Sequence, residues 1–439
     1  MAVLYAYHDT HPALVYAGAF LGGFRSVGHL THNTMTENSD RRLRVLYSFP
    51  HKIGAGGICY AAWQHVKHLH EAGADVTVFP GVLHKPLPSE ISVQPTLSRG
   101  RLRIPYKLLG KMRACRLHDW IVARRLRRMA GEFDLVHCFA LGSFETLRAA
   151  RELGLPTVLE RCNAHTGFAY EVVARECERI GIQMPDGHPH VFNAEYLRRE
   201  EAEYNLADAL FCPSEFVART FVDRGFLPAK LARFQYGFDE SACYPTADRV
   251  ESRTGLTVLF AGGCAPRKGL HYALDAWLQS SACHDGTFLV VGEFIPGYAE
   301  KLCTQLAHPS VRRLGFRKDL ADVMRTSDVL VLPSIEEGSA LVTYDARGCG
   351  CVLLVSDSTG AVCEHEHDAL VHRTGDVETL ANHFNRVHED RSLLSRLRTA
   401  SLETADELTW TAAGRQMLVS YRNVVSRHQT VVGAQFPAA

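Results

Sequence analysis

Short apolar runs alternate with helical stretches along most of this chain, and the whole pattern occurs twice. From Leu43 onward, strand-like segments such as RVLYSF (44–49) and DVTVFPG (75–81) are separated by segments of helical periodicity. Strands joined through helices in this way form parallel sheets that are covered on both faces. The pattern begins again at GLTVLFAGG (255–263). The sequence therefore predicts an α/β protein with two Rossmann-like domains that face each other across a cleft.

The expected elements define the domain boundaries. We predict helices at 59–73 and 270–281, and further strands at 133–139, 156–162, 208–214, 286–294, 311–316, 327–334 and 351–357. The first domain then covers residues 43–245 and the second covers 246–409. The last helix, at about 410–427, has no strand after it, so we expect it to cross back onto the first domain. Residues 1–42 are predicted to be a poorly ordered N-terminal extension, with Met35 as an alternative start of the chain.

The composition excludes several classes of protein. The 48 Lys and Arg residues balance 48 Asp and Glu residues, which argues against a general nucleic-acid binder. The 13 cysteines include no CxxC pair, so we expect a cytoplasmic protein without a disulfide framework. Cys349 and Cys351 lack further ligands at zinc spacing, and we expect no bound metal. No apolar run approaches the ~20 residues of a membrane span.

A glycine-rich loop, GAGGI (54–58), joins the first strand to its helix. Gly56 and Gly57 allow backbone N–H groups to approach an anion at the start of that helix. The loop departs from a dinucleotide fingerprint, because Cys59 occupies the third glycine position and the next strand ends without an acid. The alternative is that the glycines only form a tight turn.

The loop CAPRKG (264–269) occupies the equivalent place in the second domain. Its adjacent cations, Arg267 and Lys268, suit a diphosphate, because a guanidinium binds two oxygens at once and an ammonium adds a point charge. The alternative is a solvated basic turn.

The segment PSIEEGSALVTYDARGCG (333–350) follows a buried strand and carries the most chemistry. Gly338, Ser339 and Ala340 are small enough for a ligand to touch the backbone, and a helix is expected to start near Leu341 with free N–H groups. Glu337 precedes this helix and Asp345 lies within it. Because carboxylates accept several hydrogen bonds, one acid can hold a sugar and the other a ribose. The alternative is that both acids only complement the helix dipole.

Together these segments resemble the retaining glycosyltransferases of the GT-B fold, in glycosyltransferase family 4. The resemblance covers roughly residues 43–427. PSIEEGSALVTYDARGCGCVLLVSDSTGA is similar to the E-x7-E segment of the family, and FAGGCAPRKG to its G-R-x4-K-G loop. AEYNLADALFCPSEFVARTF and FQYGFDESACYP resemble its interdomain segment.

The resemblance implies a site and a reaction. Glu337 would contact the transferred sugar, Lys268 would neutralise the diphosphate leaving group, and His165 in ERCNAHTG would reach the donor sugar. The implied donor-binding set is Gly56, Gly57, Arg267, Gly338, Ser339, Ala340, Leu341, Val342 and Asp345. A nucleotide-diphosphate sugar would be the co-substrate, without a cofactor or metal, and its sugar would pass to an unidentified acceptor with retention. For His165 the alternative is a structural histidine whose hydrogen bonds are satisfied.

The sequence departs from the family pattern at some of these positions, and other functions stay open. Asp345 is one methylene shorter than the usual glutamate, and Gly263 stands where the family has an arginine that Arg267 would replace. The rival functions are a non-catalytic relative that binds a nucleotide sugar and a sugar-nucleotide epimerase of the same fold.

A basic amphipathic segment points to the acceptor side. Residues 99–128 hold eleven Lys or Arg residues against the single acid Asp119. Interleaved with Leu, Ile and Trp120, they suit peripheral contact with an anionic membrane at its inner face, or with an anionic acceptor. The alternative is a solvated helix that packs on the sheet.

Overall fold

The computed structural model describes residues 41–99, 102–104, 109–246 and 255–435. Residues from Arg42 onward form one compact unit. The predicted N-terminal extension lies outside the described residues except for its last two positions, and so does Met35. No helix in the described ranges combines the length and apolar character needed to cross a bilayer.

The first domain contains, among the described residues, a parallel sheet of seven strands in the order β3-β2-β1-β6-β7-β8-β9. The strands are β1 (Arg44–Ile53), β2 (Asp75–Leu83), β3 (Ser92–Val93), β6 (Leu135–Phe139), β7 (Thr157–Glu160), β8 (Ala209–Cys212) and β9 (Leu231–Arg233). The chain order reverses beside β1, where Val45 pairs with Val76 of β2 and with Leu135 of β6. Ligands of such sheets bind outside the carboxyl ends of the strands at this switch point.

Helices cover both faces of this sheet. They are α1 (Ile58–Glu71), α3 (Lys111–Arg128), α4 (Phe144–Glu152), α5 (Thr166–Ile180), α6 (Ala194–Leu206) and α7 (Glu215–Val222). A short antiparallel pair, β4 (Ser98–Arg99) and β5 (Leu102–Arg103), lies between β3 and α3.

The second domain contains a parallel sheet of six described strands in the order β12-β11-β10-β13-β14-β15. The strands are β10 (Thr257–Ala261), β11 (Thr287–Val291), β12 (Val311–Gly315), β13 (Val329–Leu332), β14 (Val352–Ser356) and β15 (Ala369–His372). The helices are α8 (Leu270–Gln279), α9 (Tyr298–Lys301), α10 (Cys303–Leu306), α11 (Leu320–Arg325), α12 (Leu341–Gly348), α13 (Val377–Glu389) and α14 (Arg391–Glu403). Every residue of β13 is buried, because helices cover both faces of a parallel sheet.

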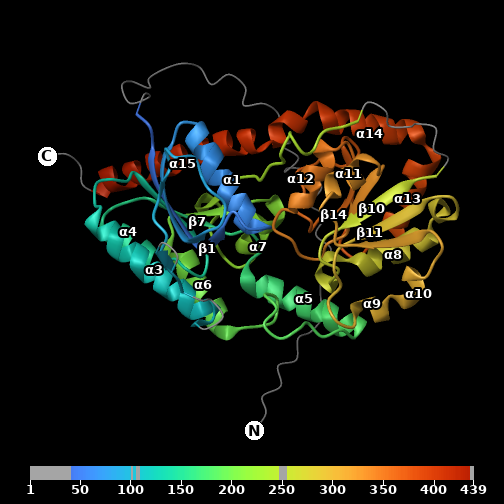
Figure 1. Ribbon diagram of the computed structural model, residues 1–439, viewed down its shortest axis with the longest axis horizontal. Helices are drawn as coiled ribbons and strands as arrows, with labels where there is room; N and C mark the ends of the chain where they lie inside the picture. The colour runs from blue at the N-terminus through green and yellow to red at the C-terminus, as the bar shows by residue number, and fades with distance from the viewer. Residues whose placement is uncertain (1–40, 100–101, 105–108, 247–254, 436–439) are drawn as a thin grey trace, which may run out of the picture. The chain divides into compact units, whose positions relative to one another are not determined.

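The C-terminal helix α15 (Trp410–Gln435) packs against α1 of the first domain, as Figure 1 shows. Its Tyr421 is fully buried, and the Tyr421 hydroxyl lies 2.8 Å from Nδ1 of His137 in β6. A Cβ on Gly414 would lie 2.6 Å from the backbone carbonyl carbon of His68, so the two helices touch at the backbone. The prediction of two Rossmann-like domains with a helix that crosses back is therefore confirmed.

Candidate active site

The predicted cations and the first predicted acid meet at the carboxyl ends of β10 and β13. Arg267 and Lys268 lie in a 3₁₀ turn, Pro266–Lys268, and the N–H of Ile335 donates to the carbonyl of Arg267 at 2.9 Å. Nη1 of Arg267 lies 3.0 Å from Oε2 of Glu337, and Nζ of Lys268 contacts the same oxygen. Burial alone would raise the pKa of Glu337, but Arg267 and Lys268 hold that pKa below its usual value. The structure thus brings these residues into one buried charge cluster.

A second acid, Glu336, also belongs to this cluster, and the sequence analysis missed it. Its side chain is fully buried, 3.3 Å from Nη1 of Arg267. It accepts hydrogen bonds from the first domain: from the N–H of Ala164 at 3.1 Å and from Nε2 of His190 at 3.1 Å. Burial would raise the pKa of Glu336, but His190 and then Arg267 lower it to about 2. Glu336 is therefore a carboxylate that connects the loops of the two sheets.

The small residues after Glu337 lie at the start of α12 and against the first domain. A Cβ on Gly338 would overlap the carbonyl oxygen of Cys162, and Ser214 Oγ donates to the carbonyl of Gly338. Ser339 is buried, with its hydroxyl 2.9 Å from that of Tyr344. Ala340 is the N-cap of α12, and no side chain of the described residues caps the first N–H groups of this helix, at Leu341 and Val342.

Asp345 lies in α12, next to the connector between the domains. Burial raises the pKa of Asp345 to about 7, and Asp239 of the connector adds to that effect, whereas a hydrogen bond with Cys243 opposes it. A protonated acid accepts hydrogen bonds more weakly than a carboxylate. The predicted ribose contact is therefore expected to depend on pH near neutrality.

The glycine-rich loop presents two kinds of glycine. A Cβ on Gly54 would lie 2.4 Å from Cβ of Lys85, so Gly54 is required by packing. A Cβ on Gly56 or Gly57 would meet no described atom within 4 Å. Gly57 is the N-cap of α1, with a φ of +62°, and provides no side-chain cap. Gly56 and Gly57 therefore border open space at the start of a helix, whereas the tight-turn alternative describes Gly54.

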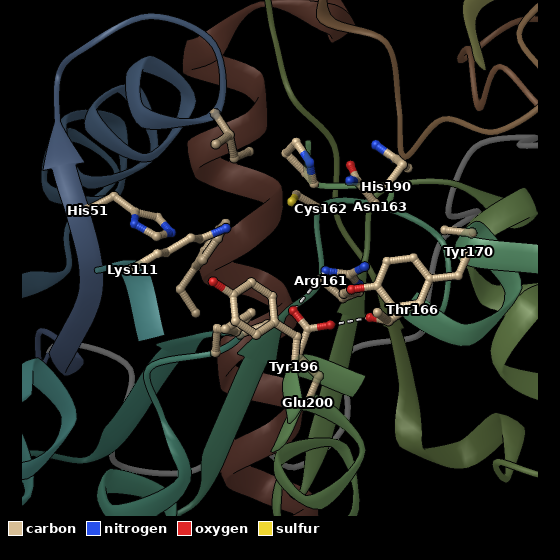
Figure 2. Close-up of a pocket in the computed structure, with 16 residues that line it drawn as sticks. His51, Lys111, Arg161, Cys162, Asn163, Thr166, Tyr170, His190, Tyr196 and Glu200 are labelled. Atoms are coloured by element: carbon tan, nitrogen blue, oxygen red, sulfur yellow. Dashed lines mark hydrogen bonds and ion pairs between the residues drawn. The ribbon is translucent and has the colours of Figure 1, made fainter. Parts of the chain in front are cut away.

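A cavity of about 220 Å³ lies in the first domain at the carboxyl ends of its strands, as Figure 2 shows. We call it the first-domain pocket; no local pattern in the sequence predicted it. It is lined by His51, Ile58, Lys111, Phe139, Ala140, Leu141, Arg161, Cys162, Asn163, Thr166, Ala169, Tyr170, Pro189, His190, Tyr196 and Glu200. The wall formed by Cys162 and His190 contacts the second domain at Gly338 and Glu336. The pocket is therefore adjacent to the charge cluster.

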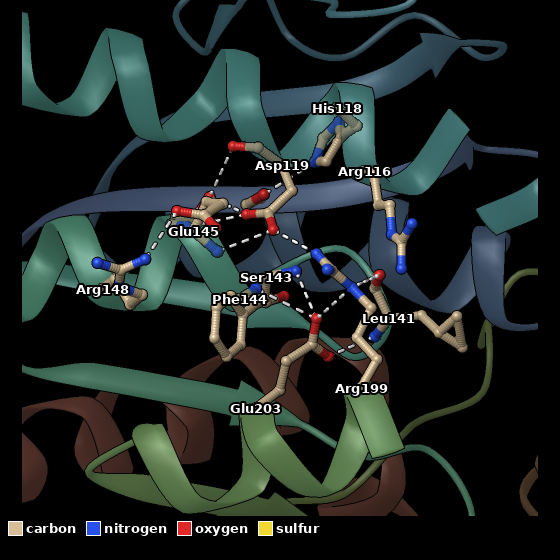
Figure 3. A network of polar contacts seen from close by, with 12 residues as sticks. Arg116, His118, Asp119, Leu141, Ser143, Phe144, Glu145, Arg148, Arg199 and Glu203 are labelled. Atoms are coloured by element: carbon tan, nitrogen blue, oxygen red, sulfur yellow. Dashed lines mark hydrogen bonds and ion pairs between the residues drawn. The ribbon is translucent and has the colours of Figure 1, made fainter. Parts of the chain in front are cut away.

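A buried polar network holds one edge of this pocket (Figure 3). Leu141 has a φ of +78°, which is unusual for a residue with a branched side chain. The carboxylate of Glu203 accepts hydrogen bonds from the N–H of Leu141 at 2.6 Å and of Ser143 at 2.9 Å. Arg199 lies between two acids, with its Nε 3.3 Å from Oε1 of Glu203 and its Nη2 2.5 Å from Oδ2 of Asp119. Nε of Arg199 also donates to the carbonyl of Leu141. These contacts stabilise the strained turn at Leu141, which forms part of the wall of the first-domain pocket.

Comparison with known proteins decides the family. A model of glycosyltransferase family 4 matches residues 55–241, and a model of the group 1 glycosyl transferases matches residues 255–390. The D-inositol 3-phosphate glycosyltransferase of Stackebrandtia nassauensis is 30% identical over 404 residues, which cover 85% of this chain and 88% of the relative. The chain belongs to glycosyltransferase family 4.

Other known proteins are also similar to this glycosyltransferase. A galactosyltransferase of Escherichia coli that acts on α-D-GlcNAc-diphosphoundecaprenol is 25% identical over 281 residues, 60% of this chain and 68% of the relative. Among solved structures, Anabaena HepE in complex with UDP-glucose has a TM-score of 0.60 at 17% identity, with 87% of this chain and all of HepE covered. This likeness shows the shared GT-B fold.

His165, the third predicted catalytic residue of this glycosyltransferase, follows Ala164, whose N–H donates to Glu336 of the charge cluster. Its side chain caps α5 by accepting from the N–H of Gly167 at 3.2 Å, and its ring packs against Tyr204 and Phe221. Burial, and then Arg224 and Arg161, lower the pKa of His165 to about 3. This is the arrangement of a buried structural histidine. The catalytic role of His165 stays a prediction.

The open space at Gly56 leads to a direct test of the loop. Gly56→Ala is expected to leave the melting temperature unchanged, because the added Cβ meets no described atom and φ is not positive. If the donor diphosphate approaches the backbone here, the methyl group should raise the donor KM by about tenfold, the effect of losing about 1.4 kcal/mol of binding. Steady-state kinetics and a thermal melt measure both quantities. An unchanged KM would mean that the donor does not touch this loop.

Proposed function

We propose that this family 4 glycosyltransferase moves a sugar from a nucleotide-diphosphate sugar to an acceptor hydroxyl with retention at the anomeric carbon. The observation that carries the proposal is the buried cluster of Arg267, Lys268 and Glu337 at the start of α12. It combines cations for a diphosphate, a carboxylate for the sugar and free helix N–H groups between them.

The proposed reaction follows from these charges. The bond between the anomeric carbon and the diphosphate oxygen breaks, and the acceptor oxygen bonds to the same face of that carbon. The acceptor proton passes to the departing diphosphate oxygen, so no protein base is needed. Arg267, Lys268 and the N–H groups of α12 stabilise the negative charge that develops on the diphosphate, and Glu337 stabilises the positive charge on the sugar.

The anomeric form of the sugar released from a donor tests whether the reaction retains the configuration and whether the protein is a transferase. Purified protein is incubated with UDP-glucose, ADP-glucose and GDP-mannose, and hydrolysis by water is followed by proton NMR. Each α-linked donor that is cleaved should release the α-anomer first. Release of the β-anomer first would show inversion and overturn the proposal. A donor that is epimerised, or bound without cleavage, would favour the rival functions.

The partly buried cations Arg267 and Lys268 predict that the reaction proceeds without a divalent metal. Arg267 and Lys268 supply the positive charge beside the diphosphate that a metal ion provides in other sites. Adding EDTA should leave the rate of donor cleavage unchanged. Lys268→Met should lower that rate strongly in the same assay. Loss of activity in EDTA that Mg²⁺ restores would contradict this prediction.

The exposed face of α3 supports a peripheral membrane contact. Arg113, Arg124 and Arg128 are exposed, and Trp120 is 52% exposed, with the guanidinium of Arg124 5.5 Å from its ring centre. Arg116 and Arg127 form ion pairs with Glu195 and Glu152. The Escherichia coli relative acts on a lipid-linked diphosphate, which is consistent with an acceptor at a membrane. We therefore propose that this face of α3 lies on the inner leaflet.

Vesicle binding tests this contact. The double variant Arg124→Gln/Arg128→Gln should bind anionic phosphatidylglycerol vesicles about 30-fold more weakly, because each cation contributes about 1 kcal/mol near such a surface. Arg125 is left intact because it is half-buried and donates to the carbonyl of Gln94. The matched control, Arg312→Gln/Lys318→Gln, removes two exposed cations from the second domain and should bind like wild type. Wild-type protein that ignores these vesicles at low salt would rule the contact out.

A further inference from the structure

One buried carboxylate of the first domain faces the second domain and takes no part in the proposed reaction. Glu176 lies in α5, and its side chain is 10% exposed. Its Oε1 lies 2.7 Å from Nε2 of His271 in α8, and its Oε2 accepts a hydrogen bond from the hydroxyl of Tyr272 at 3.1 Å. Figure 1 shows α5 extending from the first domain toward the second. The contact joins residues that are 95 positions apart, so no local pattern in the sequence predicted it.

The partners of Glu176 differ in how much water surrounds them. Arg179 bonds the carboxylate from the solvent side, with its own side chain 52% exposed, and such surface ion pairs contribute little. The side chain of His271 is 6% exposed, so its hydrogen bond to Glu176 lies in the interface between the domains. Burial alone would raise the pKa of Glu176, but His271 and then Arg179 lower that pKa to about 2. Glu176 is therefore an ionised acid that His271 holds in the interface.

Both ring nitrogens of His271 have a partner. Nδ1 lies 2.7 Å from the hydroxyl of Tyr298, which is fully buried. The backbone N–H of His271 donates to the same hydroxyl at 3.2 Å. Because this hydroxyl accepts from the backbone, its proton is available for Nδ1, and the ring proton is then on Nε2, next to Glu176. A continuous chain of hydrogen bonds thus connects Glu176 with the backbone at the start of α8.

The start of α8 continues directly from the loop that carries the predicted cations. Lys268 is the last residue of the 3₁₀ turn, and His271 is the second residue of α8. Between them, Gly269 has a φ of +70°, and a Cβ there would lie 2.0 Å from the carbonyl oxygen of Pro333. The loop therefore lies directly on the backbone that follows β13. Because so few residues separate Lys268 from His271, a shift of His271 would also move Lys268.

The first domain supports the same loop through apolar contacts. Ile335 packs in a small buried cluster with Val173 and Cys177 of α5, and its N–H donates to the carbonyl of Arg267 at 2.9 Å. α5 also contacts the turn Pro266–Lys268. Apolar contacts have no preferred direction, whereas a hydrogen bond does. The bond between His271 and Glu176 therefore orients a loop that the apolar cluster only brings close.

We propose that Glu176 is a positioning residue of this glycosyltransferase, which acts through His271 to hold Lys268 where its ammonium meets the diphosphate of the donor. This inference rests on the proposed function, in which Lys268 stabilises the departing diphosphate. Most of the predicted donor-binding set belongs to the second domain, whereas Glu176 belongs to the first. Because the charge on the diphosphate develops in the transition state, loss of the contact should lower turnover more than donor affinity.

Steady-state kinetics with matched variants tests this role. Glu176→Ala should lower kcat of donor cleavage by about 10- to 100-fold, the effect of losing a charge-assisted hydrogen bond, and should change the donor KM much less. Glu176→Gln keeps an oxygen that accepts from Nε2 of His271, so it should recover most of the lost turnover. Arg179→Gln is the control, because it removes the exposed partner of Glu176 and leaves the contact between the domains. It should behave like wild type.

Hydrogen–deuterium exchange tests the contact without activity. In full-length wild type without ligands, the N–H of His271 is hydrogen-bonded to the buried hydroxyl of Tyr298. Peptides that cover residues 266–272 should exchange about tenfold faster in Glu176→Ala, because exchange follows the free energy of local opening. Peptides from β11 should exchange as in wild type. Arg179→Gln should show the wild-type pattern throughout.

The same measurements can overturn the inference. Equal kcat of wild type and Glu176→Ala would refute it. A lower kcat that Glu176→Gln does not recover, together with faster exchange throughout the first domain, would also refute it, because Glu176 would then only stabilise the fold. Calorimetry with UDP, ADP and GDP distinguishes these results from failure of the proposed function. Wild type that binds none of the three would contradict the proposed function, even where the exchange pattern shows that Glu176 holds the loop.

Discussion

Replacing Glu337 with glutamine is expected to lower the turnover number of donor cleavage by about 10²–10³-fold, the typical cost of removing one preorganised electrostatic contact to the transition state. The substitution keeps the shape of the side chain and removes its charge. In the structure this charge also neutralises Arg267 and Lys268. Those cations then become free for a diphosphate, so the affinity for UDP should stay the same or increase. Steady-state kinetics and calorimetry with UDP measure the two effects separately.

Asp345→Asn is the matched control for this prediction. It removes the other predicted acid and should act mainly on the donor KM, because Asp345 is expected to contact the ribose. A thermal melt of each variant shows whether the fold is kept. The assigned role of Glu337 would be contradicted if the Glu337→Gln variant had the turnover number of the wild type. It would also be contradicted if this variant lost affinity for UDP in parallel with its turnover.

Replacing Gly338 with alanine is expected to lower kcat/KM by about 10²-fold, because a displacement of about 1 Å at reacting groups costs that much. The added Cβ would overlap the carbonyl oxygen of Cys162, which belongs to the other domain. Both partners are backbone, so no side chain can move aside. The loops must separate, and Glu336 then loses its contacts with Ala164 and His190.

Gly263→Ala is the control for Gly338→Ala, because it makes the same substitution in the same domain. A Cβ at Gly263 would meet no described atom within 4 Å, and its φ is not positive. This variant should keep its activity and melting temperature, while Gly338→Ala should lose activity and melt at a lower temperature. Equal activities of the two alanine variants would mean that the contact between Gly338 and Cys162 is not required for catalysis.

Most of the fold could be predicted because its strands can be recognised from short stretches of sequence. Buried strands such as Val329–Leu332 are unbroken apolar runs, which parallel sheets require on both faces. The strand β15 (Ala369–His372) was not predicted, because four residues with one histidine give no clear periodicity. The two-residue strand β3 is shorter still. Their strand character comes from pairing with β14 and β2.

The sequence predicted only those residues of the candidate site that lie together in short motifs. Arg267, Lys268 and Glu337 lie in two short loops, and their contact follows from parallel strands that end at the same edge. The role of Glu336 depends on His190, which is 146 positions away, and a sequence cannot show which of two adjacent acids faces inward. The first-domain pocket draws its lining from residues between His51 and Glu200. No window of the sequence contains it.

The crossing helix α15 has a consequence for how this chain is made. Its buried Tyr421 packs against His137 of β6 and Phe211 of β8 in the first sheet, and Gly414 lets the helix lie directly on the backbone of α1. A ribosome synthesises α1 more than 300 residues before it reaches Trp410. Until then, the apolar face of α1 that α15 covers stays open to water or to a chaperone. The helix that begins at Trp410 therefore completes the core that β1 begins, and a fragment that ends before Trp410 would leave that core incomplete.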